Sequence, residues 1–221
     1  ESGTLSFHDS QAEALGRVEQ VYNEQLNKGL NQYVSDFFNA FRELSNNPES
    51  TTTRTMVKES AEALTKDFAR VHSQLENVQE GIDVNIVNQV EQLNGFTKEI
   101  ADLNKQISAT EVQGVPANDQ RDRRDLVVKK LNELIDVRVA EGDHGAITVS
   151  TAGNAILVSG FDSLKLATVR DSTTDRIKVV YQPESSHPVL EITDRIKSGA
   201  IGGGLAIRDG IVNELKADID S

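Results

Sequence analysis

Residues 51–107 read TTTRTMVKESAEALTKDFARVHSQLENVQEGIDVNIVNQVEQLNGFTKEIADLNKQI, and this stretch decides the fold. Its apolar side chains recur every three or four residues, the spacing of one face of an α-helix. Near its start the steps alternate between four and three, which is the heptad pattern of a helix that packs along partner helices. A helix of this span would be roughly 85 Å long, which predicts an elongated molecule. The stripe consists of Val57, Ala61, Leu64, Phe68, Val71, Leu75, Val78, Ile82, Ile86, Val90, Leu93, Phe96, Ile100, Leu103 and Ile107.

The borders of this helix and two positions inside it carry further signals. Hydroxyl side chains at residues 50–53 offer an N-cap for the first turn. Gly81 and Gly95 lie within the stripe, and each weakens a helix by about 1 kcal/mol relative to alanine, so a bend or break at either stays open.

A second apolar stripe with the same spacing precedes the long helix and predicts a helix over about residues 11–45. The segment Asn46-Asn47-Pro48 ends it, because proline cannot donate a backbone hydrogen bond and pushes the preceding residue out of helical geometry. The stripe consists of Leu15, Val18, Tyr22, Leu26, Leu30, Tyr33, Phe37, Phe41 and Leu44.

A shorter helix is predicted over about residues 119–135, after a loop at residues 108–118. We expect Asp119 to cap this helix and Asp122 to lie in its acidic first turn. Arg121 and Asp125 stand four residues apart, a pairing that contributes only a few tenths of a kcal/mol. The predicted apolar face is Leu126, Val127, Leu131, Leu134 and Ile135.

From Val137 the apolar period changes from about 3.6 to two, which indicates β-strands. Tight turns rich in Gly, Asp, Asn, Ser and Pro separate six short strand-like segments, typical of a small antiparallel β domain. The glycines at 199 and 202–204 then predict a flexible hinge, and Leu205–Ile219 returns to a helical pattern. The strand-like segments are 137–140, 146–150, 155–158, 164–169, 177–181 and 189–193.

The predicted fold class is therefore α+β. It is an elongated helical bundle, with long heptad-patterned helices and a small inserted antiparallel β domain. We expect the first part of a helical domain at residues 1–136, with helices at about 11–45, 51–108 and 119–135. The inserted β domain would cover residues 137–197, and the helical domain would resume in a return helix at residues 198–221.

Composition excludes several kinds of site and partner. The 221 residues include no cysteine, so the chain forms no disulfide, thiolate zinc site or cysteine nucleophile. With 23 basic and 35 acidic side chains, the net charge is −12, which argues against binding to nucleic acid or anionic membranes. The chain opens on Glu1 without a signal-peptide pattern, and we expect it to be the middle part of a longer protein.

No catalytic, cofactor or metal motif stands out, and we expect none of these sites. The four histidines, His8, His72, His144 and His187, are far apart in sequence and form no His-Glu-x-x-His pattern. The glycine run at 202–204 lacks the following Lys-Ser or Lys-Thr of a phosphate-binding loop.

The charged start of the predicted third helix also fails as a calcium loop. Asp119, Asp122 and Asp125 lack the glycine and glutamate that such a loop requires. Because arginines at 121, 123 and 124 interleave with these acids, we expect ion pairs within the segment or with a neighbouring domain.

The same charged segment resembles a known family. Asn118-Asp119-Gln-Arg-Asp122-Arg-Arg124-Asp125-Leu126 is similar to the Asn-Asp-Leu-Leu-Asp-Gln-Arg-Asp-Leu motif of the flagellar hook-associated protein 1 family. Gln120, Arg121 and Arg123 depart from that motif and make this segment more charged. Other similar segments follow in collinear order: Phe37-Phe38-Asn-Ala-Phe41 with Asn47-Pro48, Ile100-Ala-Asp-Leu-Asn104-Lys-Gln-Ile107, Asp143-His-Gly145, Gly153-Asn154-Ala-Ile-Leu157-Val158-Ser-Gly160, and Gly202-Gly203-Gly204-Leu205 with Arg208-Asp209.

The resemblance implies a mechanical function, a structural subunit that joins hook to filament in the bacterial flagellum. It implies copies of this protein packed side by side in a ring, contacts with the hook protein and the neighbouring junction protein, and an export chaperone. It also implies an extracellular location reached through the flagellar secretion system without a cleaved signal. The motif residues would then be structural: Asn118, Asp119, Asp122, Arg124, Asp125, Leu126, Gly202, Gly203, Arg208 and Asp209.

Two other interpretations share some of these features. A different coiled-coil interaction or stalk protein, of phage-tail or adhesin type, would use the stripe of residues 57–107 between chains. An enzyme would need titratable groups that converge in a pocket around Asp143, His144 and Asn154.

Overall fold

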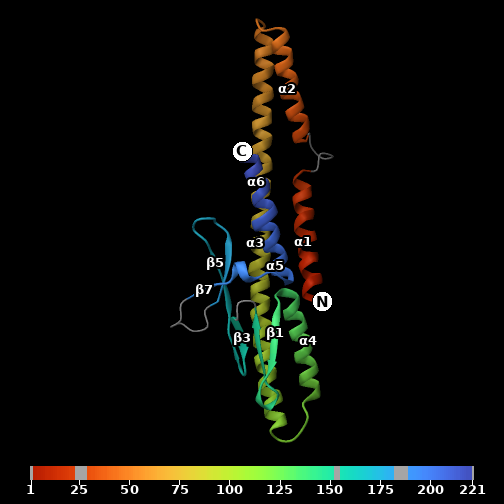
Figure 1. Ribbon diagram of the computed structural model, residues 1–221, viewed down its shortest axis with the longest axis vertical. Helices are drawn as coiled ribbons and strands as arrows, with labels where there is room; N and C mark the ends of the chain where they lie inside the picture. The colour runs from red at the N-terminus through yellow and green to blue at the C-terminus, as the bar shows by residue number, and fades with distance from the viewer. Residues whose placement is uncertain (1, 23–28, 152–154, 182–188, 221) are drawn as a thin grey trace.

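The chain forms a long rod of helices with strands along one side, as the computed structural model in Figure 1 shows. The structure describes residues 2–22, 29–151, 155–181 and 189–220. The helices are α1 (Ser2–Val21), α2 (Leu30–Asn46), α3 (Thr51–Glu111), α4 (Asn118–Leu134), α5 (Gly199–Ala206) and α6 (Val212–Asp220). The strands are β1 (Val137–Glu141), β2 (Ile147–Thr151), β3 (Ala155–Ser159), β4 (Asp162–Ser163), β5 (Leu166–Arg170), β6 (Ile177–Tyr181) and β7 (Leu190–Glu191).

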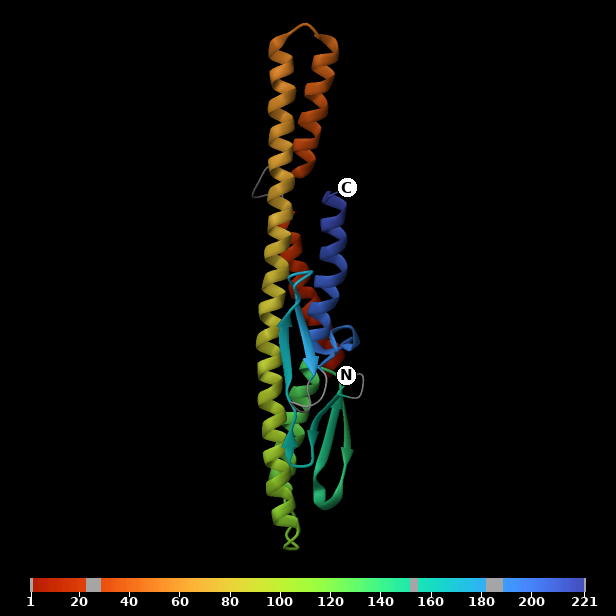
Figure 2. The same ribbon diagram turned by 90° about the vertical axis from the view of Figure 1, so that its left-hand side faces the viewer.

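Helix α3 confirms the long helix predicted from the stripe. It has 61 residues and runs unbroken through Gly81 and Gly95. At its start the Ser50 hydroxyl oxygen accepts a hydrogen bond from the backbone N–H of Thr53, so the predicted hydroxyl cap is present. Because α3 runs almost the whole length of the molecule, the other helices and strands from both sheets pack beside it (Figure 2).

The single helix predicted over residues 11–45 is wrong, because the structure has two helices, α1 and α2, in that region. Helix α1 begins at Ser2, and Gly29 before α2 has an extended backbone (φ −72°, ψ 163°) that does not continue a helix. Both helices pack on α3 and so each keeps an apolar stripe. Periodicity alone therefore could not show that there are two of them.

The strands form two antiparallel sheets. Their orders are β1-β2-β3-β4 and β5-β6-β7, so neighbours in sequence are neighbours in each sheet. The six predicted strand segments correspond to β1, β2, β3, β5, β6 and β7, while β4 was not predicted. Both sheets lie alongside α3 (Figure 1).

The glycine run predicted as a hinge is instead the helix α5, and its glycines are buried. A Cβ atom at Gly203 would collide with the carbonyl oxygen of Phe7 on α1. Gly199 has a φ of +71°, and a Cβ there would collide with the backbone of Leu134 at the end of α4. The glycines therefore permit close packing of α5 on α1 and α4.

The final helical segment covers the predicted residues, but the side chains that face the core differ from those that a regular α-helix would place there. Between α5 and α6 the helix widens into one π-helical turn, Ile207–Ile211. Such a turn inserts an extra residue and rotates the face that follows. Ile211, four residues from both Ile207 and Leu215, is therefore 36% exposed, while Val212 is fully buried.

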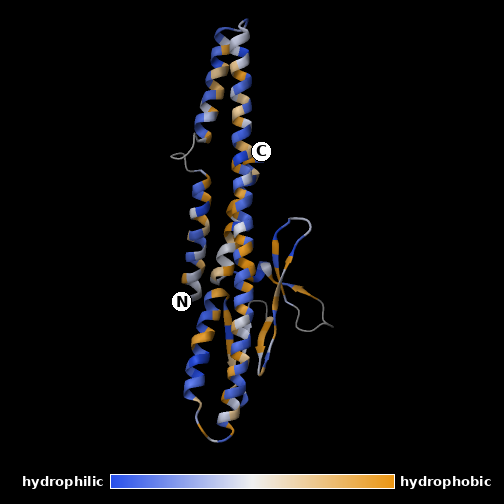
Figure 3. Cartoon of the chain, turned by 180° about the vertical axis from the view of Figure 1, so that it is seen from behind, coloured by the Kyte–Doolittle hydropathy of each residue, from blue (hydrophilic) through white to orange (hydrophobic). Residues whose placement is uncertain are grey.

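One hydrophobic core joins the helices to both sheets. It contains α3 side chains from Val71 to Leu103, together with side chains from α1, α4, α5 and the strands. Hydrophobic and hydrophilic residues alternate along the helices in Figure 3, as expected of helices with one apolar face. Our division into a helical domain and an inserted β domain at residues 137–197 remains a proposal.

Candidate functional site

Of the motif residues on α4, only Arg124 is buried. Its Nη1 donates hydrogen bonds to Oδ1 of Asn104 on α3, at 2.9 Å, and to the carbonyl oxygen of Gly145, at 2.6 Å. Burial lowers the pKa of Arg124. Leu126, predicted on the apolar face, is 53% exposed instead. Four other motif residues are also exposed: Asn118, Asp119, Asp122 and Asp125.

Asn104 connects this arginine to the first sheet. Its Oδ1 accepts the N–H of Ile147 at 3.2 Å, and its Nδ2 donates to the carbonyl oxygen of Ile147 at 2.9 Å. The same Nδ2 lies 2.6 Å from the carbonyl oxygen of Gly160. We call Arg124, Asn104, Gly145 and Ile147 the Arg124 clasp, because together they tie α4, α3 and β2.

Asn94, ten residues earlier on α3, holds the second sheet in the same way. Its Nδ2 donates to the carbonyl oxygen of Leu166 at 2.8 Å, and its Oδ1 accepts the N–H of Leu166 at 3.0 Å. Each asparagine thus presents one donor and one acceptor to a strand, as a neighbouring strand would. Two side chains of one helix thereby position two sheets.

Arg121 extends the polar contacts around the Arg124 clasp. It binds Glu111 at the end of α3 through two hydrogen bonds of 2.7 and 2.8 Å, and Glu141 on β1 at 3.1 Å. The hydrogen bonds from Arg121 lower the pKa of Glu111. The predicted pairing of Arg121 with Asp125 is therefore wrong, since the guanidinium points toward α3 and β1.

The start of α4 differs from the prediction in two further ways. Its N-cap residue is Ala117, and Asp119 lies in the first turn, where Asp122 was expected. Arg123 pairs with Glu99 on α3 at 2.7 Å. Arg121 and Arg123 are two of the positions at which the sequence departs from the family motif. Both form ion pairs, as expected from the sequence, and these pairs bind α4 to neighbouring elements.

A second buried arginine, Arg208, lies in the π-helical turn. Its Nη1 lies 2.5 Å from Oδ1 of Asp83 on α3 and 2.7 Å from the carbonyl oxygen of Ile177 on β6. Its Nε and Nη2 bind the two carboxylate oxygens of Asp209 at 2.7 and 2.8 Å. Burial raises the pKa of Asp83, although the hydrogen bond and the charge of Arg208 act to lower it. We call Arg208, Asp83, Asp209 and Ile177 the Arg208 clasp.

A buried ion pair of this kind contributes little net stability but fixes geometry, since breaking it leaves an uncompensated charge. The Arg208 clasp ties the π-helical turn, α3 and the second sheet at one point. Gln79 on α3 also donates to the carbonyl oxygen of Arg208, at 3.1 Å. The two clasps therefore hold one sheet each against α3.

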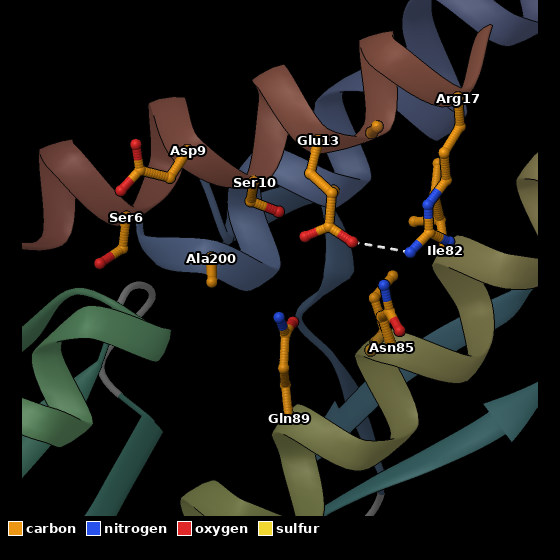
Figure 4. Close-up of a pocket in the computed structure, with 12 residues that line it drawn as sticks. Ser6, Asp9, Ser10, Glu13, Arg17, Ile82, Asn85, Gln89 and Ala200 are labelled. Atoms are coloured by element: carbon orange, nitrogen blue, oxygen red, sulfur yellow. Dashed lines mark hydrogen bonds and ion pairs between the residues drawn. The ribbon is translucent and has the colours of Figure 1, made fainter. Parts of the chain in front are cut away.

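A hollow lies between α1, α3 and α5 (Figure 4). Glu13 and Arg17 face it and pair with each other at 2.7 Å, and Asn85 and Gln89 approach from α3. Ser6 and Ser10 of α1 also line it, but among the described residues neither hydroxyl is hydrogen-bonded to a base that could activate it as a nucleophile.

The pocket considered for an enzyme is not formed by the described residues. Asp143 and His144 are exposed beside the Arg124 clasp, and Asn154 lies outside the described residues, as does His187. Among the residues that the structure describes, no three His, Asp or Glu side chains gather as a metal site would require. Within the same residues, no helix is long and apolar enough to cross a membrane.

The sequence reasoning missed Asn94, Asn104 and Asp83. None of the three was singled out from the sequence, yet Asp83 and Asn104 are almost fully buried. The available signal was spacing, since Asn104 stands four residues after Ile100 and three before Ile107, and Asp83 stands three before Ile86. A polar residue within an apolar face predicts a specific buried partner.

The comparisons with known proteins agree with this geometry. A family model described as the flagellar hook-associated protein FlgK helical domain matches residues 15–221. The chain belongs to this family. A solved relative, "The structure of the flagellar hook junction protein FlgK from Burkholderia pseudomallei", superposes with a TM-score of 0.85 at 25% identity and covers 99% of this chain. The α+β fold predicted from the sequence is therefore confirmed.

Curated relatives of the FlgK helical-domain family extend well beyond this region. Flagellar hook-associated protein 1 of Bacillus subtilis is 30% identical over 77% of this chain, and that of Salmonella typhimurium is 29% identical over 92%. The chain spans 34% and 37% of these two relatives, or about a third of their length, and 40% of the solved structure.

Proposed function

We propose that the full-length protein is a structural subunit of the bacterial flagellum that joins hook to filament, and that this region is its helical shaft. The family match over residues 15–221 carries the proposal. A continuous 61-residue helix braced by α1, α2 and α4 suits a part that transmits force, because no flexible joint interrupts it.

The partners follow from the same proposal. Copies of the protein would pack side by side through their helical domains in a ring, against the hook protein on one side and the next junction protein on the other. An export chaperone would bind the subunit before assembly, and the subunit would reach the outside of the cell without a cleaved signal. Nucleic acid and membrane are not proposed partners, in keeping with the net charge of −12.

The two clasps support a mechanical role for the motif residues. Arg124 and Arg208 each join a sheet to α3, so the sheets would move with the shaft as one body. We propose no catalytic function. The exposed motif residues Asn118, Asp119, Asp122 and Asp125 remain proposed structural positions whose contacts would lie with other parts of the assembly.

The alternative of a coiled-coil stalk is disfavoured by one observation. From Val71 to Ile107, the stripe of α3 is buried within a single chain, except for half-buried Phe96, under α1, α4, α5 and the strands. A stalk protein would leave that stripe free to pack between chains.

A deletion strain of the source bacterium tests the proposal. Removing the gene for the full-length protein is expected to leave hooks without filaments and to release filament subunits into the medium. A plasmid copy of the gene should restore attached filaments, while the empty plasmid should not. Electron microscopy that showed normal filaments on the hooks of the deletion strain would refute the function.

A further inference from the structure

The upper hairpin, formed by α2 and residues 51–70 of α3, lies outside the hydrophobic core. Among the described residues, the core cluster contains none from α2, and its first member on α3 is Val71. Phe38 is 61% exposed and Phe41 is 47% exposed, although both rings stack edge-on against Phe37. A helix pair derives its stability from burying an apolar face, so this hairpin lacks a covering element.

One face of α3 is covered by α6 along part of its length and continues beyond the end of α6 into the upper hairpin. Helix α6 packs on α3 at His72, Glu76, Gln79 and Asp83, directly or through the adjoining π-helical turn. Counting back by three or four residues, the same face carries Phe68, Thr65 and Ala61, which α6 does not reach. Thr65 is exposed, and Phe68 and Ala61 are only half-buried. Beyond the end of α6, the same face of α3 therefore continues as a partly exposed strip made of Ala61, Thr65 and Phe68.

The contacts between α3 and α6 define a regular antiparallel register. Gln79 meets Asn213 at 2.7 Å, Glu76 meets Lys216 at 3.2 Å, and His72 meets Asp220 at 3.9 Å. Each step of three or four residues toward the start of α3 is thus matched by an equal step toward the end of α6. Figures 1 and 2 show α6 running along α3 and stopping just below the hairpin.

We infer that the upper hairpin is the docking surface for a helix that continues α6 in the full-length protein. In the register just described, about 11 further helical residues would bring this helix to Ala61. The segment would be amphipathic, with its apolar side on Ala61 and Phe68 and its polar side toward water. The relatives have length to supply it, since this region spans only about a third of them. The inference concerns contacts within one chain and stands apart from the proposed junction function.

Thiol accessibility in the full-length protein tests this docking surface. The region has no cysteine, so one can be placed at will, after any cysteine elsewhere has been replaced by serine. Thr65→Cys lies on the proposed surface, and Glu59→Cys is its control on another side of α3, because both residues are exposed in this structure. Both substitutions are at exposed positions of a helix and leave the core unchanged.

We expect Thr65→Cys to react with a maleimide about tenfold more slowly than Glu59→Cys, at protein concentrations where the full-length chain is monomeric. In the 221-residue region alone, the two should react at similar rates. Equal rates in the full-length monomer would overturn the inference. Protection of Thr65→Cys that disappears on dilution would also overturn it, because a second copy would then be the occupant.

Discussion

Asn104 on α3 and Ile147 on β2 are joined by two hydrogen bonds, from the Ile147 N–H to Oδ1 at 3.2 Å and from Nδ2 to the Ile147 carbonyl oxygen at 2.9 Å. This arrangement copies the pairing of residues on adjacent strands. A helix cannot offer backbone groups to a strand, since its own are used within the helix. A side-chain amide supplies the missing donor and acceptor, and so fixes the register between helix and sheet.

Replacing Asn104 by alanine is expected to lower the free energy of unfolding by about 2–4 kcal/mol. The change leaves the backbone groups of Ile147 and one hydrogen bond of buried Arg124 without their partner. Urea unfolding followed by circular dichroism measures the loss. Asn88→Ala is the matched control, an exposed asparagine of the same helix that should change stability by about 0.5 kcal/mol or less. Equal losses in the two variants would contradict the role of the Arg124 clasp.

Arg124 and Asn104 should act as one unit. In a double-mutant cycle of Asn104→Ala and Arg124→Met, we expect a coupling energy of about 1–3 kcal/mol, because each residue holds the other. The control cycle combines Arg124→Met with Asn94→Ala, whose hydrogen bonds go to Leu166 and not to the clasp. That second pair should be additive within about 0.5 kcal/mol. Additivity in the first cycle would show that the two residues stabilise the fold separately.

Much of the helical shaft could be predicted because its signal is local. The stripe of α3 repeats every three or four residues over its full length, and the structure keeps it as one helix. The pairing of strands in two sheets could not be read from the same kind of signal. Strand periodicity reports which side chains share a face, but not which strands exchange hydrogen bonds.

The clasps escaped prediction because their partners are distant in sequence. Arg208 meets Asp83 across 125 positions, and no local pattern links them. Arg124 and Arg208 were identified only as motif residues, through the family resemblance, and the burial that explains them depends on the assembled fold. The missed asparagines show the same limit, since a buried amide on α3 can be recognised only once the strand that it binds is in place.

Acid should weaken the contact of α4 with α3. The hydrogen bonds from Arg121 hold the pKa of Glu111 below its ordinary value of 4.5. A carboxyl whose pKa is lowered on folding stabilises the fold above its unfolded pKa, and this contribution is lost as pH falls through the folded pKa. Between about pH 5 and pH 3, the native chain should therefore lose more stability than Glu111→Gln does.

Urea unfolding at a series of pH values measures this difference. Glu91→Gln is the control, an exposed glutamate of α3 for which the described residues show no ion pair, and it should follow the native pH dependence. The result would count against the role of Glu111 if its variant and the control lost stability in parallel as pH fell.

Two glycine-to-alanine substitutions should shift stability in opposite directions. At Gly203 a methyl group would meet the carbonyl oxygen of Phe7, so α5 and α1 must separate, at a cost of about 1–3 kcal/mol. At Gly95 on α3 a methyl group meets nothing within 4 Å, and alanine should stabilise the helix by up to about 1 kcal/mol. Thermal unfolding distinguishes the two cases, with a lower midpoint expected for Gly203→Ala and a higher one for Gly95→Ala. If Gly203→Ala instead raised the midpoint, a methyl group at residue 203 would fit without separating α5 from α1, and the close contact with Phe7 would be refuted.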